Sequence, residues 1–75
     1  MARVINPAAL RDVRVLVGIS GRELARRCGI SETVVSGIEL GKHGVTPELM
    51  RKLADTLGVS LDTITVPVPE SRASA

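Results

Sequence analysis

The feature that most constrains the fold is a helix stop followed at once by a helix start, which occurs three times. Each instance is a glycine, an aliphatic residue and a serine: Gly18-Ile19-Ser20, Gly29-Ile30-Ser31 and Gly58-Val59-Ser60. Glycine ends a helix because it adopts the left-handed closing conformation without strain, and a serine side chain accepts hydrogen bonds from the free amides of the next first turn. These breaks predict several short helices joined by tight turns.

Two further helix starts combine a cap residue with proline, at Asn6-Pro7 and Thr46-Pro47. Proline suits the first helical position because the amide there has no helical partner to lose. Ser20 also opens a capping box, in which Glu23 would reach back to the Ser20 amide. Within each segment, apolar residues recur at the spacing of one helix face. The expected inward-facing positions are Leu10, Val13, Leu16, Val17, Leu24, Ala25, Cys28, Ile30, Val35, Ile38, Leu49, Met50, Leu53, Ala54, Leu57, Leu61 and Ile64.

The expected fold class is all-α, a compact domain of five short helices over residues 6–65. Residues 1–5 are expected to form a flexible N-terminal arm, on which Arg3 could follow a groove of a binding partner. Residues 66–75 are expected to form an extended or disordered tail. The alternating prolines of Val66-Pro67-Val68-Pro69 exclude helix and favour extended backbone, so this segment is an extended strap.

Composition excludes several classes of function. The chain is 44% apolar, yet it contains no Phe, Tyr or Trp, so no aromatic ring can stack on single-stranded nucleic acid or cage a cation. One His, one Cys and no clustered carboxylates give neither a catalytic set nor a metal site. We therefore expect no enzyme, no cofactor and no small-molecule ligand. A lone cysteine forms no internal disulfide, and no apolar run suits a signal peptide or membrane span, so we expect a soluble cytoplasmic protein.

Five blocks of sequence carry a resemblance to a known family. They are Glu23-Leu24-Ala25, Gly29-Ile30-Ser31, Ile38-Glu39 with Gly41-Lys42, Leu53-Ala54, and Leu57-Gly58-Val59-Ser60-Leu61. In this order and spacing they resemble the lambda-repressor/Cro-type (Xre) helix-turn-helix family, from about Asn6 to Ile64. The resemblance implies that the third helix enters the major groove of duplex DNA while the second crosses the phosphate backbone.

The resemblance also implies which residues meet DNA. Glu32, Thr33 and Gly37 occupy base-reading positions, and Val34 adds an apolar contact if it faces the groove. Glu32 can accept from the cytosine amine, Thr33 can pack on a thymine methyl, and Gly37 offers space for a close approach to the duplex. The expected phosphate-binding residues are Gly21, Arg22, Arg26, Ser31, Ser36, Lys42 and His43, with further positive charge from Arg3, Arg11, Arg14 and Arg27. The family often has Gln where this chain has Gly21, and the reading positions here lack Gln, Arg and Asn.

Several of these residues also have ordinary structural interpretations. Glu32 would favour the helix dipole at a first-turn position, the arginines of the second helix would form a solvated face, and Glu39 is expected to make a structural contact. Cys28 is expected to be a small core residue. The net charge of +2 is a weak indication of a polyanionic partner, so the distribution of charge has to carry the argument.

The sequence thus predicts a sequence-specific, double-stranded DNA-binding transcriptional regulator of the phage Cro or repressor type, which blocks transcription at an operator. A homodimer is expected on a palindromic site, joined through the fifth helix and the Val66–Pro69 strap. Two alternatives remain. One is another DNA-binding role, as an antitoxin or a restriction controller, and the other is a protein-interaction module that has kept the fold without reading DNA.

Overall fold

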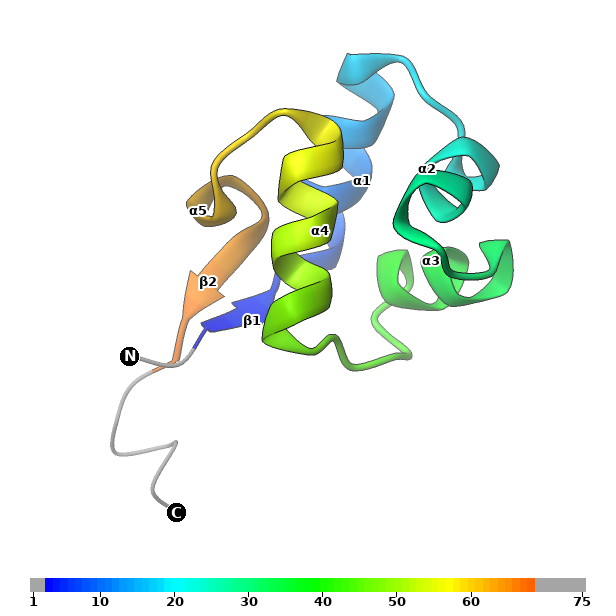
Figure 1. The fold of residues 1–75 in the computed structure, drawn as a ribbon. Helices are drawn as coiled ribbons and strands as arrows, with labels where there is room; N and C mark the ends of the chain where they lie inside the picture. The colour runs from blue at the N-terminus through cyan, green and yellow to red at the C-terminus, as the bar shows by residue number, and fades with distance from the viewer. Residues whose placement is uncertain (1–2, 69–75) are drawn as a thin grey trace.

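The computed structural model describes residues 3–68 and forms five helices and a two-stranded sheet. The helices are α1 (Pro7–Val17), α2 (Gly21–Cys28), α3 (Glu32–Glu39), α4 (Pro47–Leu57) and α5 (Leu61–Ile64), and the strands are β1 (Arg3–Ile5) and β2 (Thr65–Pro67). The predicted all-α class with five helices is confirmed, with the short sheet as a minor addition (Figure 1). None of the helices within residues 3–68 has the length and apolar character needed to cross a membrane.

Four helices begin at the caps expected from the sequence. The side chains of Asn6, Ser20, Ser31 and Thr46 each accept a hydrogen bond from the amide three residues on, at 3.0–3.2 Å. The three glycines at the repeated breaks all have positive φ, as a left-handed helix end requires. Ser60 differs, because its hydroxyl bonds the side chain of Thr63 at 3.0 Å and makes no side-chain cap bond to the α5 backbone.

The core is aliphatic and receives side chains from all five helices. Its largest fully buried members are Leu10 of α1, Leu24 of α2, Val35 and Ile38 of α3, Leu53 of α4 and Ile64 of α5. Cys28 is buried among these residues, as expected. In Figure 1, α4 stands between α5 with the sheet on one side and the α2–α3 pair on the other. The face of α3 that carries Val35 and Ile38 packs into the core, and the opposite face of this helix is exposed to solvent.

The expected inward stripe of α1 is wrong at its C-terminal end. Leu16 is 85% exposed, and Val17 is also exposed, whereas Leu10 is fully buried. Leu16 lies six residues after Leu10, which places it about 120° around the helix axis from the buried face. Val17 returns to the Leu10 side of α1, but the last turn of this helix extends past α2 and α3 (Figure 1).

The expected flexible arm is wrong for the described residues Arg3–Ile5, which pair antiparallel with Thr65–Pro67. The register places Val4 opposite Val66 and Ile5 opposite Thr65. The backbone N–H of Asn6 donates to the backbone carbonyl of Ile64 at 2.8 Å. The extended strap expected near the C-terminus enters the domain as β2, so the expected boundary after residue 65 falls inside a strand. Pro67 fits this two-stranded sheet because each strand is an edge strand. Residues 1–2 and 69–75, including Pro69, lie outside the described residues.

Candidate nucleic-acid interface

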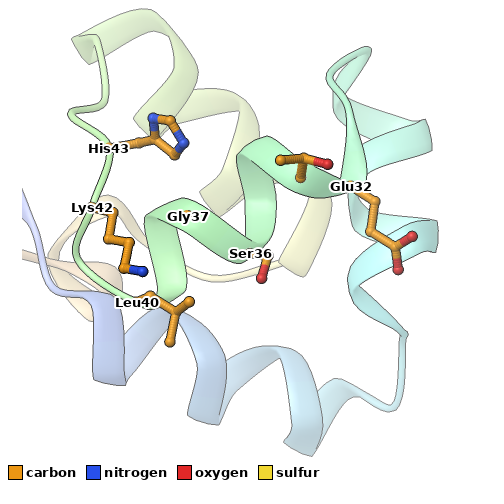
Figure 2. A pocket seen from close by; sticks show the side chains of 7 residues that line it. Glu32, Ser36, Gly37, Leu40, Lys42 and His43 are labelled. Atoms are coloured by element: carbon orange, nitrogen blue, oxygen red, sulfur yellow. The ribbon is translucent and has the colours of Figure 1, made fainter.

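The outer face of α3 carries a stripe of exposed side chains. Glu32, Thr33, Ser36 and Leu40 recur at helical spacing and none of them is buried. Together with the loop after the helix they line an open groove of about 460 Å³ (Figure 2). The residues that line the groove are Glu32, Thr33, Ser36, Gly37, Leu40, Lys42 and His43. The groove thus brings together six of the eleven residues that the sequence assigned to base or phosphate contact, and it does not include Val34, Gly21, Arg22, Arg26 or Ser31.

Val34 is the predicted base-reading residue that the structure does not place in this groove. Its side chain is partly buried and packs against the core. A base contact by Val34 was expected only if Val34 faces the groove, and this condition is not met, because its position on α3 turns it toward the other helices. Its backbone amide donates to the cap oxygen of Ser31 at 3.2 Å, so the Ser31 hydroxyl is engaged in starting α3.

Gly37 lies beneath the imidazole of His43. A Cβ atom at Gly37 would overlap the Cδ2 and Nε2 atoms of His43 and would lie 2.9 Å from its Cγ. The Gly37 carbonyl also accepts from the Lys42 amide at 2.8 Å and the His43 amide at 3.3 Å. The expectation that Gly37 leaves open space for the duplex is therefore wrong, because the His43 imidazole from the following loop fills that space.

A partly buried ion pair joins α1 to the end of α3. The Arg14 Nε donates to Glu39 Oε2 at 2.7 Å, and Nη2 donates to Oε1 at 3.1 Å. The Arg14 Nη1 donates to the Ile19 carbonyl at 3.0 Å, and the hydrogen bond with Glu39 raises the pKa of Arg14 above its ordinary value. The structural role expected for Glu39 is confirmed. Arg14 is not a free cation of the basic face, because its charge is neutralised here.

The basic face of α2 contains an internal ion cluster. Glu23 accepts from Arg26 Nη2 at 2.6 Å, from Arg26 Nε at 3.0 Å and from Arg27 Nε at 2.6 Å. These two guanidinium groups lower the pKa of Glu23 to about 2. The expected return of Glu23 to the Ser20 amide is not formed, since the arginines occupy the carboxylate; only the Ser20 half of the capping box is present. Arg22 is exposed and has no ion pair within residues 3–68.

Gly21, at the start of α2, lies beside the outer face of α3. It shares a small groove of about 200 Å³ with Glu32, Ser36 and the Arg14–Glu39 pair. The first residues of α2 carry amides without helical partners, and such a helix start favours anions. The structure therefore places the predicted phosphate positions Gly21 and Ser36 close to the predicted base position Glu32.

Two other cations differ in their availability. The expectation that Arg3 follows a groove is wrong, because its Nε donates to Thr65 Oγ1 at 2.7 Å and its Nη2 pairs with Asp62 at 3.2 Å. Arg11 is exposed on α1 and lines a small groove with Ser36 and Leu40. Arg11 thus extends the α3 face, and Arg3 does not.

Leu40 is a groove residue to which the sequence assigned no contact. It is 66% exposed at the end of α3, where it continues the stripe one turn after Ser36. The helical periodicity of the stripe was the signal that could have revealed it. Within residues 3–68, no group of three or more His, Cys, Asp or Glu side chains is arranged to hold a metal ion.

Two eight-residue helices, α2 and α3, are thus joined by a tight turn at Gly29, and α3 presents a face that makes no packing contribution to the core. Residues 10–64 match the helix-turn-helix family model. The chain belongs to the helix-turn-helix family. The resemblance to lambda-repressor/Cro-type members that the sequence blocks indicated is confirmed, and the match includes every residue of α2 and α3 and of the groove.

Similar proteins include a hypothetical transcription factor and a restriction-modification controller protein. A hypothetical transcription factor of Neisseria meningitidis is 36% identical over 68 residues, which are 91% of this chain and 64% of that protein, so this chain spans under two thirds of its length. The Neisseria crystal structure matches with a TM-score of 0.75 at 34% identity, over 91% of this chain and 77% of that one. The restriction-modification controller C.AhdI of Aeromonas hydrophila matches with a TM-score of 0.73 at 30% identity, over 76% and 83%.

One similar structure is an enzyme. HppE, solved with cobalt(II) and substrate, matches with a TM-score of 0.76 at 26% identity. The match covers 84% of this chain but only 35% of HppE. The likeness is therefore confined to a part of HppE.

Proposed function

We propose that this protein is a sequence-specific DNA-binding transcriptional regulator that places α3 in the major groove of a duplex operator. The observation that carries the proposal is the outer face of α3, on which Glu32, Thr33 and Ser36 are exposed and line one groove. The start of α2, at Gly21, adjoins this face and suits a phosphate. The relatives described as a hypothetical transcription factor and a restriction-modification controller protein support the same role.

Within this role, Thr33 packs its methyl on a thymine methyl and Glu32 accepts from a cytosine amine. Phosphate contacts come from the α2 start and from Arg22, with Lys42 in the loop after α3. Glu32 supplies discrimination more than affinity, because a carboxylate close to phosphates weakens non-specific binding. The regulator occupies an operator and blocks transcription by steric competition, as a Cro or repressor-type protein of the bacterial or phage-infected cytoplasm.

A second copy completes the proposed regulator, because one module covers too few base pairs to bind tightly. The side chains of Val4 and Val66 are cross-strand partners in the sheet and both are exposed. This apolar pair adjoins α5, so it supports a homodimer through α5 and the β1–β2 sheet. A two-fold dimer of this kind reads a palindromic site.

A second candidate function is control of a restriction-modification system. The likeness to C.AhdI favours it, because the match covers most of both chains. Both candidates use the same DNA face, and they differ only in which genes carry the operator. Selection of genomic fragments, in place of random duplexes, would separate them: a site upstream of restriction and modification genes supports the controller.

The test of DNA reading is selection of random duplexes through several rounds at two salt concentrations. We expect a palindromic consensus whose enrichment is lost on Thr33→Ala or Glu32→Ala and is weaker at high salt. Asp55→Ala, at an exposed position on α4, is the matched control and should leave the consensus unchanged. If no sequence is enriched even at low salt, the protein-interaction alternative replaces this proposal.

A further inference from the structure

The place of a side chain at position 37 is taken by the His43 imidazole. The family implies that position 37 reads a base, yet Gly37 has no side chain to do so. A Cβ at Gly37 would overlap two ring atoms of His43, including Nε2. The ring therefore occupies the volume in which a reading side chain on α3 would begin, although it belongs to the loop after the helix.

The loop that carries His43 is attached to the last turn of α3. The amides of Lys42 and His43 both donate to the Gly37 carbonyl, and the Gly41 amide donates to Ile38 at 3.0 Å. Gly41 has φ of 76°, a left-handed conformation that turns the chain back along the helix. In Figure 2 the loop runs alongside α3 and carries Lys42 and His43 past the same side of Gly37. The position of His43 is thus set by α3 itself.

The ring remains accessible. His43 is exposed and lines the same groove as Glu32, Thr33 and Ser36. Its side chain has no hydrogen bond or ion pair within residues 3–68, so neither ring nitrogen is engaged by another residue there, and the nitrogen that carries the proton can donate to a ligand. In the major groove, the acceptor that both purines present is N7.

We propose that His43 is a base-reading residue that donates to the N7 of a purine, in place of the side chain absent from Gly37. This inference rests on the proposed DNA-binding function and adds a specificity-determining residue to it. The sequence had placed His43 beside a phosphate. A phosphate contact stabilises every sequence alike, whereas contact with a base edge discriminates at one position.

The test uses the duplex that the wild-type protein selects, with each purine replaced in turn by its 7-deaza analogue, in which a carbon replaces N7. We expect one purine in each half-site at which the replacement weakens wild-type binding by about 3- to 10-fold, as loss of a single hydrogen bond implies. His43→Ala should bind the unmodified duplex more weakly by a similar factor and should not respond to the replacement. Lys42→Ala is the matched control, and it should keep the 7-deaza response.

A second variant tests the geometry. Gly37→Ala adds the Cβ that the ring excludes, so it should displace the imidazole and remove the same purine preference. In a His43→Ala background, Gly37→Ala should cause no further loss, which makes the two changes strongly non-additive. Circular dichroism of each variant confirms that the fold is kept.

Two results would overturn the inference. If His43→Ala weakens binding to all sequences equally and leaves the 7-deaza response intact, His43 contacts only phosphate, while the proposed DNA-binding function stands. If the wild-type protein selects no sequence at all, the proposed function and this inference fail together.

Discussion

The Arg14 and Glu39 side chains are only 16% and 10% exposed, and they form two hydrogen bonds to each other. Removing one partner of such a pair leaves a charge that is poorly solvated and unpaired. We predict that Glu39→Ala lowers the free energy of unfolding by about 3 kcal/mol, the lower end for a buried ion pair. Urea denaturation measures this. Arg26→Ala, which breaks an exposed ion pair, is the control and should lower the free energy of unfolding by less. Equal losses for the two variants would show that the Arg14–Glu39 pair stabilises the fold no more than an exposed pair does.

The Glu23 carboxylate should titrate far below the ordinary glutamate range, because Arg26 and Arg27 lower its pKa to about 2. The folded-state value lies below the unfolded value of about 4.3. The contribution of Glu23 to stability is therefore complete above about pH 4.3 and is lost as the pH falls toward 2. Carbon-13 NMR of the Glu23 carboxyl carbon measures the midpoint directly. In Arg26→Ala the titration midpoint of Glu23 should rise toward 4.3. An unchanged midpoint would contradict the inference that Arg26 lowers the pKa of Glu23.

Single residues differ in how far the sequence predicts their contacts. The caps at Asn6, Ser20, Ser31 and Thr46 were predictable, because a cap bonds an amide only three residues away. The partner of Glu23 was not predictable from the capping-box pattern alone. The Ser20 backbone amide competes with the guanidinium groups of Arg26 and Arg27 for the Glu23 carboxylate. The charged donors make the stronger hydrogen bonds.

Among the elements, α1 separates buried from exposed apolar positions. We predict that Leu10→Ala lowers the free energy of unfolding by about 2–5 kcal/mol, because it leaves a cavity in the core. Leu16→Lys should change it by less than about 0.5 kcal/mol, since Leu16 is largely exposed. Chemical denaturation of both variants checks the contrast. A large loss for Leu16→Lys would mean that the end of α1 is covered in solution, for example by a second copy.

The β1–β2 sheet shows what local patterns leave undetermined. The spacing of the prolines predicted that residues 66–69 are extended. The structure agrees for Val66 and Pro67, which belong to β2. The partner strand lies about 60 residues away, and the Arg3 contacts with Asp62 and Thr65 span the same separation. Neither can be inferred from spacing along the chain. The stripe on α3 was predictable because it follows one helix period, whereas the inward turn of Val34 and the ring of His43 over Gly37 depend on neighbouring elements.

At the scale of the whole molecule, ion pairs within the protein determine which arginine side chains are available to bind a polyanion. Arg3, Arg14, Arg26 and Arg27 have carboxylate partners, while Arg22 has no ion pair within residues 3–68. We predict that Arg22→Ala weakens DNA binding more than Arg26→Ala, because Arg26 has to give up Glu23 before it can contact a phosphate. Fluorescence anisotropy at several salt concentrations measures both affinity and salt dependence. Arg22→Ala should reduce the slope of log affinity against log salt by about one; an equal reduction for Arg26→Ala would contradict the assignment.

The proposed dimer makes a prediction about the molecule as a pair. Val4 and Val66 are exposed cross-strand partners at the end of the molecule that carries the sheet (Figure 1), away from the groove on α3. A lysine at Val66 would place two like charges across a two-fold axis, so Val66→Lys should dissociate the dimer while leaving the isolated fold intact. Sedimentation velocity reports the change in mass, and circular dichroism reports the fold.

The same variant should lose tight binding to a duplex with two half-sites while keeping weak binding to one. Half-sites one helical turn apart, about 34 Å, are the spacing expected for a two-fold pair of reading helices. Leu16→Lys, at an exposed apolar position on the end of α1, is the matched control and should keep both mass and affinity. If Leu16→Lys dissociates the pair and Val66→Lys does not, the two copies meet through α1. If neither variant changes the mass of a tightly binding protein, neither apolar surface holds the copies together.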